Sequence, residues 1–453
     1  TEPLLPMSPA PDPGADPDSV PHQLPAPAPA ADGAAEAGHP LHPGCPALLP
    51  GAIIGHGAGD PGPLYAHLRA EHPAYHDPLL DVWVLSRHQD IDTVLRDTTG
   101  AYTAAHAYTP LHALHPEALA ALESGGGVPV LSSLDPPLHG RFRRQMTATF
   151  PTTERRMAAH HGWIHQRATD TARALAARTP RTADLLADYA RPLSMSVIGH
   201  LLGVPAPDLA GVAERATALS TLVWGHPQAS DQLTAAHALD DLWNHCHTLV
   251  LRKAEAPADD LISAWLTHRD TDGTPFTPRE VASTLMEALI TNAEVTPRLI
   301  ANALHHLLTT RTLHTLHRAG GLPRAVEETL RHSTPLIGWQ RATTRATDLG
   351  EVRLPAGARL LLLLASAARD EVHGVCDPDA FDVERPHQPP HRAFGAGIHY
   401  CPGDAFGRHL THQALAALAE ACPELALTDE APGPDHWPLN AALRGPHVLP
   451  GTW

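Results

Sequence analysis

The chain has few cysteines for its length, and no two of them form a paired motif. Five occur in 453 residues. They are Cys45, Cys246, Cys376, Cys401 and Cys422. Because no CxxC pair exists, neither a zinc site nor a disulfide framework is indicated. The 34 histidines are scattered and form no HExxH pattern, which favours surface positions over metal ligands.

Long apolar runs and an excess of positive charge are also absent. The longest apolar run, Leu360 to Ala368, is too short to cross a bilayer, which takes roughly 20 residues. Lys and Arg total 32 against 49 Asp and Glu, for a formal net charge of −17. Nucleic-acid binding needs a basic surface. We therefore expect a soluble, cytoplasmic protein that has neither nucleic acid nor a membrane as its partner.

Large apolar side chains are scarce in residues 1–50, which are rich in Pro, Ala and Gly. Such a segment cannot bury enough surface to offset its ordering entropy, so we expect a disordered leader there. It has no basic start followed by an apolar run, which argues against a signal peptide.

The rest of the chain is patterned mainly for helices. The clearest pattern runs from Arg279 to Leu308, where apolar or small residues recur at steps of three and four, and it predicts a long, central, buried helix. Residues 81–88 and 360–364 predict short strands. Residues 100–129, which contain "ESGGGVP", predict a long flexible loop region. The fold class is therefore mainly α with small β-sheets.

One cysteine stands out because of its neighbours in "AFGAGIHYCPGDAFGRH". Gly395, Gly397 and Gly403 surround Cys401, so the backbone can turn sharply and a bulky group can approach closely. The periodicity that follows predicts a helix beginning near Pro402, whose positive end favours a thiolate. A thiolate on such a turn suits a flat metal cofactor. A buried structural cysteine fits the spacing equally well.

The motif "FGAGIHYCPG", Phe394 to Gly403, resembles the haem-binding signature of the cytochrome P450 family. Three further motifs agree with that resemblance. "EETLR" contains Glu328 and Arg331 at the spacing of the family's buried ion pair, and "FDVERP" would add Arg385 to it. The remaining matches are to residues that hold the haem propionates, and they are His139 and Arg143 in "DPPLHGRFRR", Arg341 and His399.

The resemblance implies a single catalytic unit over residues 51–453, with haem b between the long central helix and the cysteine loop. Cys401 would be the axial iron ligand. It further implies an oxidase that activates O2 with electrons from ferredoxin and ferredoxin reductase, acts as a monomer on a small molecule, and tailors secondary metabolites. Residues 100–129, 222–226 and 336–340 would line the substrate pocket, and Trp339 and Gln340 could face the ligand.

The sequence departs from the family in the middle of the long helix, "ALITNAEVTPRLI". In the resemblance to the family, Asn292 takes the place of a motif glycine and Glu294 that of the motif's acidic residue. Val295 takes the place of the threonine that lies above the oxygen-binding face. Val295 has no hydroxyl with which to position a proton donor, and Thr296 points about 100° away on a regular helix. Glu294 is the residue we expect to deliver protons. Pro297 has no N–H to donate to the Ala293 carbonyl, so a kink in the helix is predicted there.

Three functional readings remain open from the sequence. The first is an oxidase with an atypical or non-hydroxylating outcome, such as coupling. The second is a peroxide-driven relative that needs no electron partner. The third is a haem-binding sensor without turnover.

Overall fold

The computed structural model describes Ile53 and residues 59–124, 130–225, 227–374, 376–386, 390–431, 433–438 and 440–453. The leader expected at residues 1–50 lies outside these ranges, so its disorder stays a prediction.

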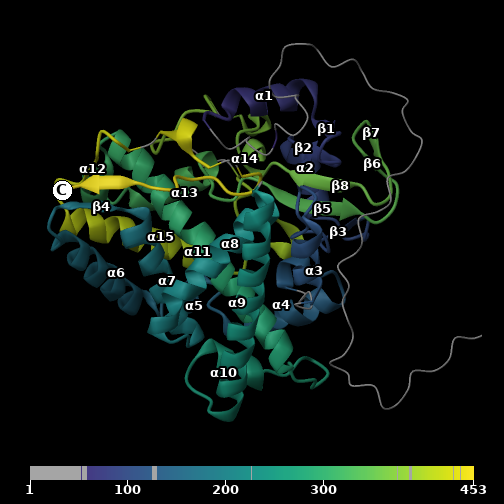
Figure 1. Ribbon diagram of the computed structural model, residues 1–453. Coiled ribbons are helices and arrows are strands. Elements are labelled where there is room, and N and C mark those ends of the chain that lie inside the picture. Colours follow the sequence, from purple (N-terminus) through teal and green to yellow (C-terminus); the bar gives the residue numbers. More distant parts are fainter. Residues whose placement is uncertain are drawn as a thin grey trace, which may run out of the picture.

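Helices make up most of the described chain, as the sequence predicts, and they form the left and lower parts of Figure 1. The first group is α1 (Gly62–Glu71), α2 (His88–Leu95), α3 (Pro116–Ser124), α4 (Leu138–Thr149), α5 (Glu154–Met157), α6 (His161–Ala176), α7 (Arg191–Leu202) and α8 (Leu209–Trp224). The second group is α9 (Ala229–Glu255), α10 (Leu261–Thr267), α11 (Pro278–Thr309), α12 (Leu313–Ala319), α13 (Leu322–His332), α14 (Leu364–Ala367) and α15 (Asp404–Ala421). None of these helices combines the length and the hydropathy that a membrane-spanning segment requires.

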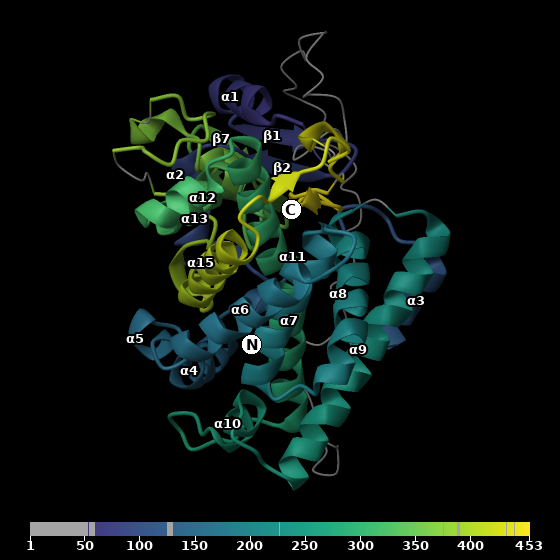
Figure 2. The same ribbon diagram turned by 90° about the vertical axis from the view of Figure 1, so that its left-hand side faces the viewer.

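The long helix predicted over residues 279–308 is confirmed as α11. Its start is fixed by a capping box, in which the Thr277 hydroxyl accepts from the Glu280 N–H at 3.2 Å and the Glu280 carboxylate accepts from the Thr277 N–H at 2.8 Å. Pro278 occupies the first helical position. The predicted apolar stripe is buried against α7, α8, α9, α13 and α15, which places α11 at the centre of the helical part (Figure 2).

The sheets are small and lie beside the helical part. The strands are β1 (Ala74–Asp77), β2 (Val82–Leu85), β3 (Tyr102–Thr103), β4 (Thr182–Asp184), β5 (Trp339–Thr343), β6 (Thr347–Leu349), β7 (Val352–Leu354), β8 (Arg359–Leu362), β9 (Ala426–Leu427) and β10 (Pro450–Thr452). The largest sheet has the order β1-β2-β8-β5-β3, and its β2 and β8 run parallel. Its β1 and β2 lie next to α1 and α2 in Figure 1. This sheet carries Arg341 on β5 toward the centre of the molecule.

The expectation of an irregular loop over residues 100–129 is wrong in part. The strand β3 and the helix α3 lie within it. Ala118 is fully buried in a cluster with Ala235 and Ala236 of α9. The helix is therefore stabilised by a partner more than 100 residues away, which local composition does not reveal.

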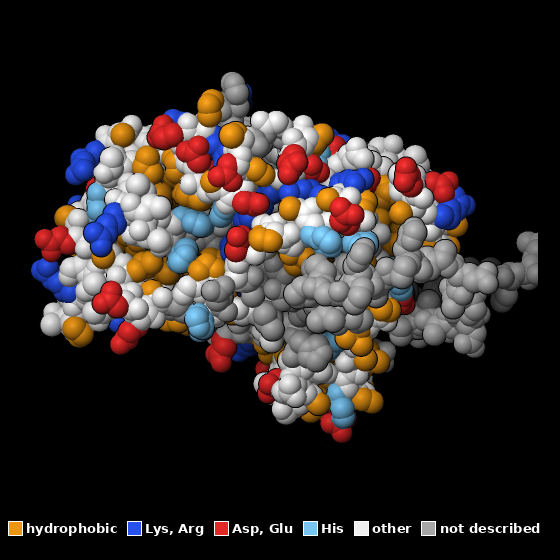
Figure 3. Space-filling model, turned by 90° about the horizontal axis from the view of Figure 1, so that it is seen from above, with side chains coloured by type: hydrophobic (Ala, Val, Ile, Leu, Met, Phe, Trp, Pro, Cys, Tyr) orange, Lys and Arg blue, Asp and Glu red, His pale blue; other side chains and the backbone are white. Residues whose placement is uncertain are grey.

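Charge is mixed over the molecular face seen from above in Figure 3, where acidic and basic side chains both occur among neutral and apolar ones.

Candidate active site

Cys401 lies on a tight turn between a 3-10 turn (Gly397–His399) and α15. Gly395 and Gly397 have φ values of 69° and 68°, in the left-handed region that favours glycine. A Cβ atom on Gly397 would collide with the carbonyl oxygen of Leu95, so this position also needs the smallest residue. The Cys401 N–H donates to the Phe394 carbonyl at 2.9 Å, and this bond closes the turn.

The sulfur of Cys401 is held in a setting that opposes its ionisation. Its Sγ accepts one hydrogen bond, from the Gly403 N–H at 3.3 Å. Burial nevertheless raises the pKa of the Cys401 thiol to about 11. A positive metal ion against the sulfur would favour its thiolate form.

Cys401 opens into one large cavity beneath α11. Leu299, Leu330 and Met146 are among the apolar side chains of its wall. Nearly all of the predicted catalytic and cofactor-binding residues line it, namely Cys401, His139, Arg143, Arg341, Phe394, Gly395, Gly403, His399, Asn292, Glu294, Val295 and Thr296. Gly397 does not line the cavity, but its left-handed backbone conformation shapes the turn that carries Cys401. The structure thus brings together residues that are separated by more than 250 positions in the sequence.

Four basic side chains converge on this cavity without an acidic partner. Within the described ranges none of His139, Arg143, Arg341 and His399 forms an ion pair with a carboxylate. His139 Nε2 and His399 Nδ1 are buried and have no hydrogen-bond partner, and the two rings lie 4.3 Å apart. Arg341 donates only to the adjacent Gln340 carbonyl, at 2.8 Å.

The pKa values of three of these groups are lowered, because their charged forms are disfavoured in this arrangement. Burial, with the guanidinium of Arg143 nearby, lowers the pKa of His139 to about 4. Burial, with Arg341 nearby, lowers the pKa of His399 to about 3. Burial also lowers the pKa of Arg341 to about 10. An anionic group with several acceptor oxygens would satisfy these donors, and the paired carboxylates of a haem fit that description.

The predicted ion-pair network forms beside this site. Arg331 donates to both carboxylate oxygens of Glu328, at 2.8 and 2.7 Å, and both side chains are fully buried. Arg385 Nε donates to the same Glu328 carboxylate at 3.2 Å. Arg331 and Arg385 also bond the carbonyls of residues 376–380, so the network fixes the segment that leads to the cysteine loop.

Polar groups of α11 that line the cavity are tied to their own helix. Asn292 Nδ2 donates to the Ala288 carbonyl at 2.9 Å, and Thr291 Oγ1 donates to the Glu287 carbonyl at 2.9 Å. Thr296 Oγ1 is 3.4 Å from Asn292 Oδ1. Val295 offers no polar atom, so the helix presents no free hydroxyl at that position.

The Glu294 carboxylate is buried and fully engaged. It accepts from Thr217 Oγ1 at 2.6 Å and Ser220 Oγ at 2.7 Å, both on α8. Arg298 donates to it at 2.8 Å, and Arg191 lies 3.8 Å away. The side chain therefore links the cavity wall to a partly exposed arginine.

The predicted pocket-lining segments reach the cavity, with one exception. Tyr108, Trp224, Leu336 and Trp339 line it. Gln340 does not, because its side chain donates to the Thr109 carbonyl at 2.8 Å. Glu287 also lines the cavity but was not predicted. The sequence did indicate this position, because Glu287, Thr291 and Val295 follow one another at steps of four residues. That spacing puts the three side chains along one face of the helix.

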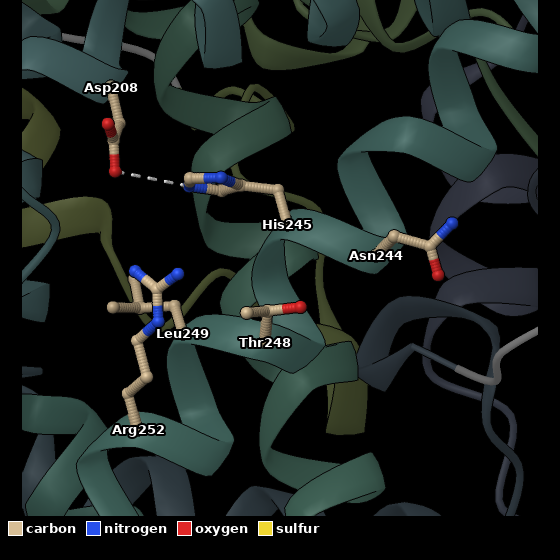
Figure 4. A pocket seen from close by; sticks show the side chains of 6 residues that line it. All are labelled: Asp208, Asn244, His245, Thr248, Leu249 and Arg252. Atoms are coloured by element: carbon tan, nitrogen blue, oxygen red, sulfur yellow. Dashed lines mark ion pairs between the residues drawn. The ribbon is translucent and has the colours of Figure 1, made fainter.

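A second hollow lies away from this cavity and shares no residue with it. It is lined by Asp208, Asn244, His245, Thr248, Leu249 and Arg252. Figure 4 shows the His245 ring pointing toward Asp208, with Nε2 3.8 Å from the carboxylate. No residue of the predicted site lies there.

A cysteine on a glycine-rich turn, a long helix across the cavity and basic side chains without an acidic partner in the described ranges are the features expected of a helical haem-thiolate oxidoreductase. Comparisons with known proteins agree. The family model "Cytochrome P450" matches residues 277–422. Cytochrome P450 monooxygenase PikC of Streptomyces venezuelae is 34% identical over 414 residues, which are 90% of this chain and 94% of that protein.

Two further comparisons extend this agreement to another enzyme and to the fold. Nocardicin C N-oxygenase of Nocardia uniformis subsp. tsuyamanensis is 32% identical and covers 86% of this chain and 95% of its own length. The solved structure of cytochrome P450 CREJ in complex with (4-ethylphenyl) dihydrogen phosphate has a TM-score of 0.80, at 28% identity, and covers 88% of this chain and 99% of that one. The chain belongs to the cytochrome P450 family and is an oxidoreductase of the monooxygenase type.

Proposed function

We propose that the chain is a haem-thiolate oxidase in which Cys401 is the axial ligand of haem b and α11 covers the oxygen-binding face. The observation that carries this proposal is the cavity into which Cys401 opens together with four basic side chains that have no carboxylate partner in the described ranges. The bound haem would supply the oxygen chemistry, while the protein binds, orients and protonates. His139, Arg143, Arg341 and His399 would hold its carboxylates.

Glu294 is the proton carrier in this proposal. Its carboxylate touches Thr217 and Ser220 inside the protein and Arg191, whose side chain is 28% exposed, on the outer side. Hydroxyl groups and a carboxylate in contact can pass a proton along a chain of hydrogen bonds. The chain would therefore move protons from solvent toward the cavity through Glu294.

The final proton has no donor at residue 295, so it must come from a substrate hydroxyl or a water. This favours an atypical or non-hydroxylating oxidation, such as coupling, over simple hydroxylation. The polar groups of Thr291 and Asn292 support this inference, because both already bond carbonyls of α11.

Electrons are proposed to arrive from ferredoxin and its reductase at the face where the cysteine loop reaches the surface. Ile398 and Tyr400, which precede Cys401 in that loop, are exposed by 40% and 37%. We propose a monomeric, cytoplasmic enzyme whose substrate is a small molecule of secondary metabolism, as the relatives' names suggest for those proteins.

Turnover of the haem-loaded protein with NADPH, ferredoxin and ferredoxin reductase tests this function. Consumption of O2 and NADPH that depends on ferredoxin and on an added metabolite is the expected result. Turnover with hydrogen peroxide alone would identify the peroxide-driven relative. No turnover in either assay, with haem bound, would identify a non-catalytic haem protein.

A further inference from the structure

Glu287 is an acidic side chain in the cavity with no basic partner. It lies on α11, seven residues before Glu294, and its carboxylate accepts from the Ser132 N–H at 3.1 Å. Glu294 is neutralised by Arg298 and Arg191, whereas Glu287 forms no ion pair with any residue in the described part of the chain. Burial raises its pKa. Without a cation nearby, the partly buried Glu287 side chain is protonated more readily than in water, whereas a cation from outside the chain would stabilise its charged form.

Three aromatic side chains surround the same end of the cavity. Tyr108, Trp224 and Trp339 all line it. Their ring centroids lie 5.6 Å apart between Tyr108 and Trp224, 5.7 Å between Tyr108 and Trp339, and 5.6 Å between the two tryptophans. They come from three separate parts of the chain, namely the segment after β3, the last residue of α8 and the first residue of β5.

Ser132 ties the aromatic group to the acid. Its hydroxyl donates to the Tyr108 hydroxyl at 3.2 Å, while its N–H donates to Glu287. Trp224 Nε1 is buried, and no residue in the described part of the chain accepts a hydrogen bond from it. Ser132 thus links Tyr108 to Glu287, and Trp224 and Trp339 contact Tyr108 in the same cavity wall.

Aromatic faces and a carboxylate together select positive charge. The faces attract a cation through their quadrupoles, and this attraction is stronger when the cation is desolvated. An apolar wall that only filled space would need the rings but not Glu287. The formal net charge of −17 would also favour the approach of a cationic ligand.

We propose that Tyr108, Trp224, Trp339 and Glu287 form a subsite for a protonated or quaternary amine, so that the substrate is a basic, amine-bearing small molecule. This inference rests on the proposed function, because it names the substrate class of that same cavity. The amine anchors one end of the substrate and leaves the other end free to reach the haem face.

Binding of two matched probes to the oxidised, haem-loaded protein tests the subsite. The cationic probe is (2-phenoxyethyl)trimethylammonium, and the neutral one is its carbon isostere, 3,3-dimethylbutyl phenyl ether. The quaternary nitrogen has no lone pair, so it cannot bind iron. Isothermal titration calorimetry should give an affinity about tenfold or more higher for the cation, because the carboxylate and the rings together favour positive charge.

Variants then assign the preference to these residues. Glu287→Gln keeps the shape and the acceptor for Ser132, and it should reduce the affinity ratio to about threefold or less, since the rings still favour a cation. Trp339→Leu should weaken the cation more than the isostere. Glu420→Gln removes the same charge from the exposed side of α15 and should leave the ratio unchanged. Equal binding of both probes by the wild-type protein, or an unchanged ratio in Glu287→Gln, would overturn the proposal.

The failure of this inference can be told from the failure of the proposed function. The carbon monoxide difference spectrum of the reduced protein reports the thiolate haem alone. A normal spectrum with equal probe binding would reject only the amine subsite.

Discussion

At the scale of single residues, Val295 is the side chain whose predicted departure from the family's pattern matters most for the proposed function. It lines the cavity where a hydroxyl is expected. Its polar neighbours do not replace that hydroxyl freely, because Thr291 and Asn292 bond carbonyls of α11 and Thr296 lies 3.4 Å from Asn292. Under the proposed function, Glu294 therefore brings protons to the cavity, and a substrate hydroxyl or a water passes on the last one.

Restoring the hydroxyl should change how the electrons are used. In Val295→Thr we expect more hydroxylated product and less hydrogen peroxide per NADPH, by about tenfold or more, since a positioned proton donor contributes ~10²–10⁴-fold. Product and peroxide yields with the same substrate provide the measurement. Val295→Ala, which adds no hydroxyl, is the control. Unchanged yields in Val295→Thr would show that residue 295 has no special role.

Residues that belong to short sequence motifs were predictable from the sequence, whereas residues whose contacts lie far away in the sequence were not. Cys401, Glu328 and Arg331 follow from short local patterns. Glu287 looked like an ordinary polar position on a helix, because its partner Ser132 lies 155 residues away. A buried role of this kind becomes visible only when distant segments are brought together.

At the scale of elements, α11 determines the shape of the cavity, and its periodicity was strong enough to predict nearly its full length. Pro297 lies inside it, and α11 continues as one helix on both sides. Ser194 donates to the Asn292 carbonyl at 2.8 Å, and Arg298 Nη1 to the Glu294 carbonyl at 2.9 Å. Side chains thus satisfy carbonyls just before the proline. The kink itself stays a prediction.

Removing Pro297 should stabilise the helix. Pro297→Ala restores the N–H that can bond the Ala293 carbonyl, so we expect the free energy of unfolding to rise by about 1–3 kcal/mol. Denaturant unfolding of the haem-loaded protein measures it. Pro278→Ala is the matched control, because proline suits the first helical position and its loss should bring no gain. A loss of stability in Pro297→Ala would contradict this account of the helix.

The elements that the sequence did not predict are those stabilised by long-range contacts. The helix α3 has helix-forming residues, but the neighbouring glycines favoured a loop. Its burial against α9 decides the outcome. Short strands such as β3 exist only because a partner, here β5, lies beside them.

At the scale of the whole molecule, the many histidines make stability depend on pH. His306 stacks on Phe381 at a ring distance of 4.2 Å and bonds Ser333 at 2.7 Å. Burial, with His305, Arg444 and Arg369 nearby, lowers the pKa of His306 to about 3. The unfolded chain binds a proton there near pH 6.5, whereas the folded chain does not. Acid below pH 6.5 therefore favours the unfolded state.

The sign of this effect gives a specific expectation. Between pH 6.5 and about 4 the free energy of unfolding should fall, with His306 contributing up to about 1.4 kcal/mol per pH unit. His306→Gln should make that slope shallower, while His237→Gln, at an exposed position, should not. Urea unfolding at a series of pH values provides the comparison. An identical slope in His306→Gln and the wild-type protein would refute the assignment.

The central claim is that this chain holds haem through the sulfur of Cys401, and the carbon monoxide difference spectrum of the reduced protein tests it most directly. The wild-type protein and Cys376→Ser, which changes an exposed free cysteine, should show the red-shifted Soret band of thiolate ligation. Cys401→Ser should lose that band. A thiolate band that persists in Cys401→Ser, or one missing from the haem-loaded wild-type protein, would contradict the account.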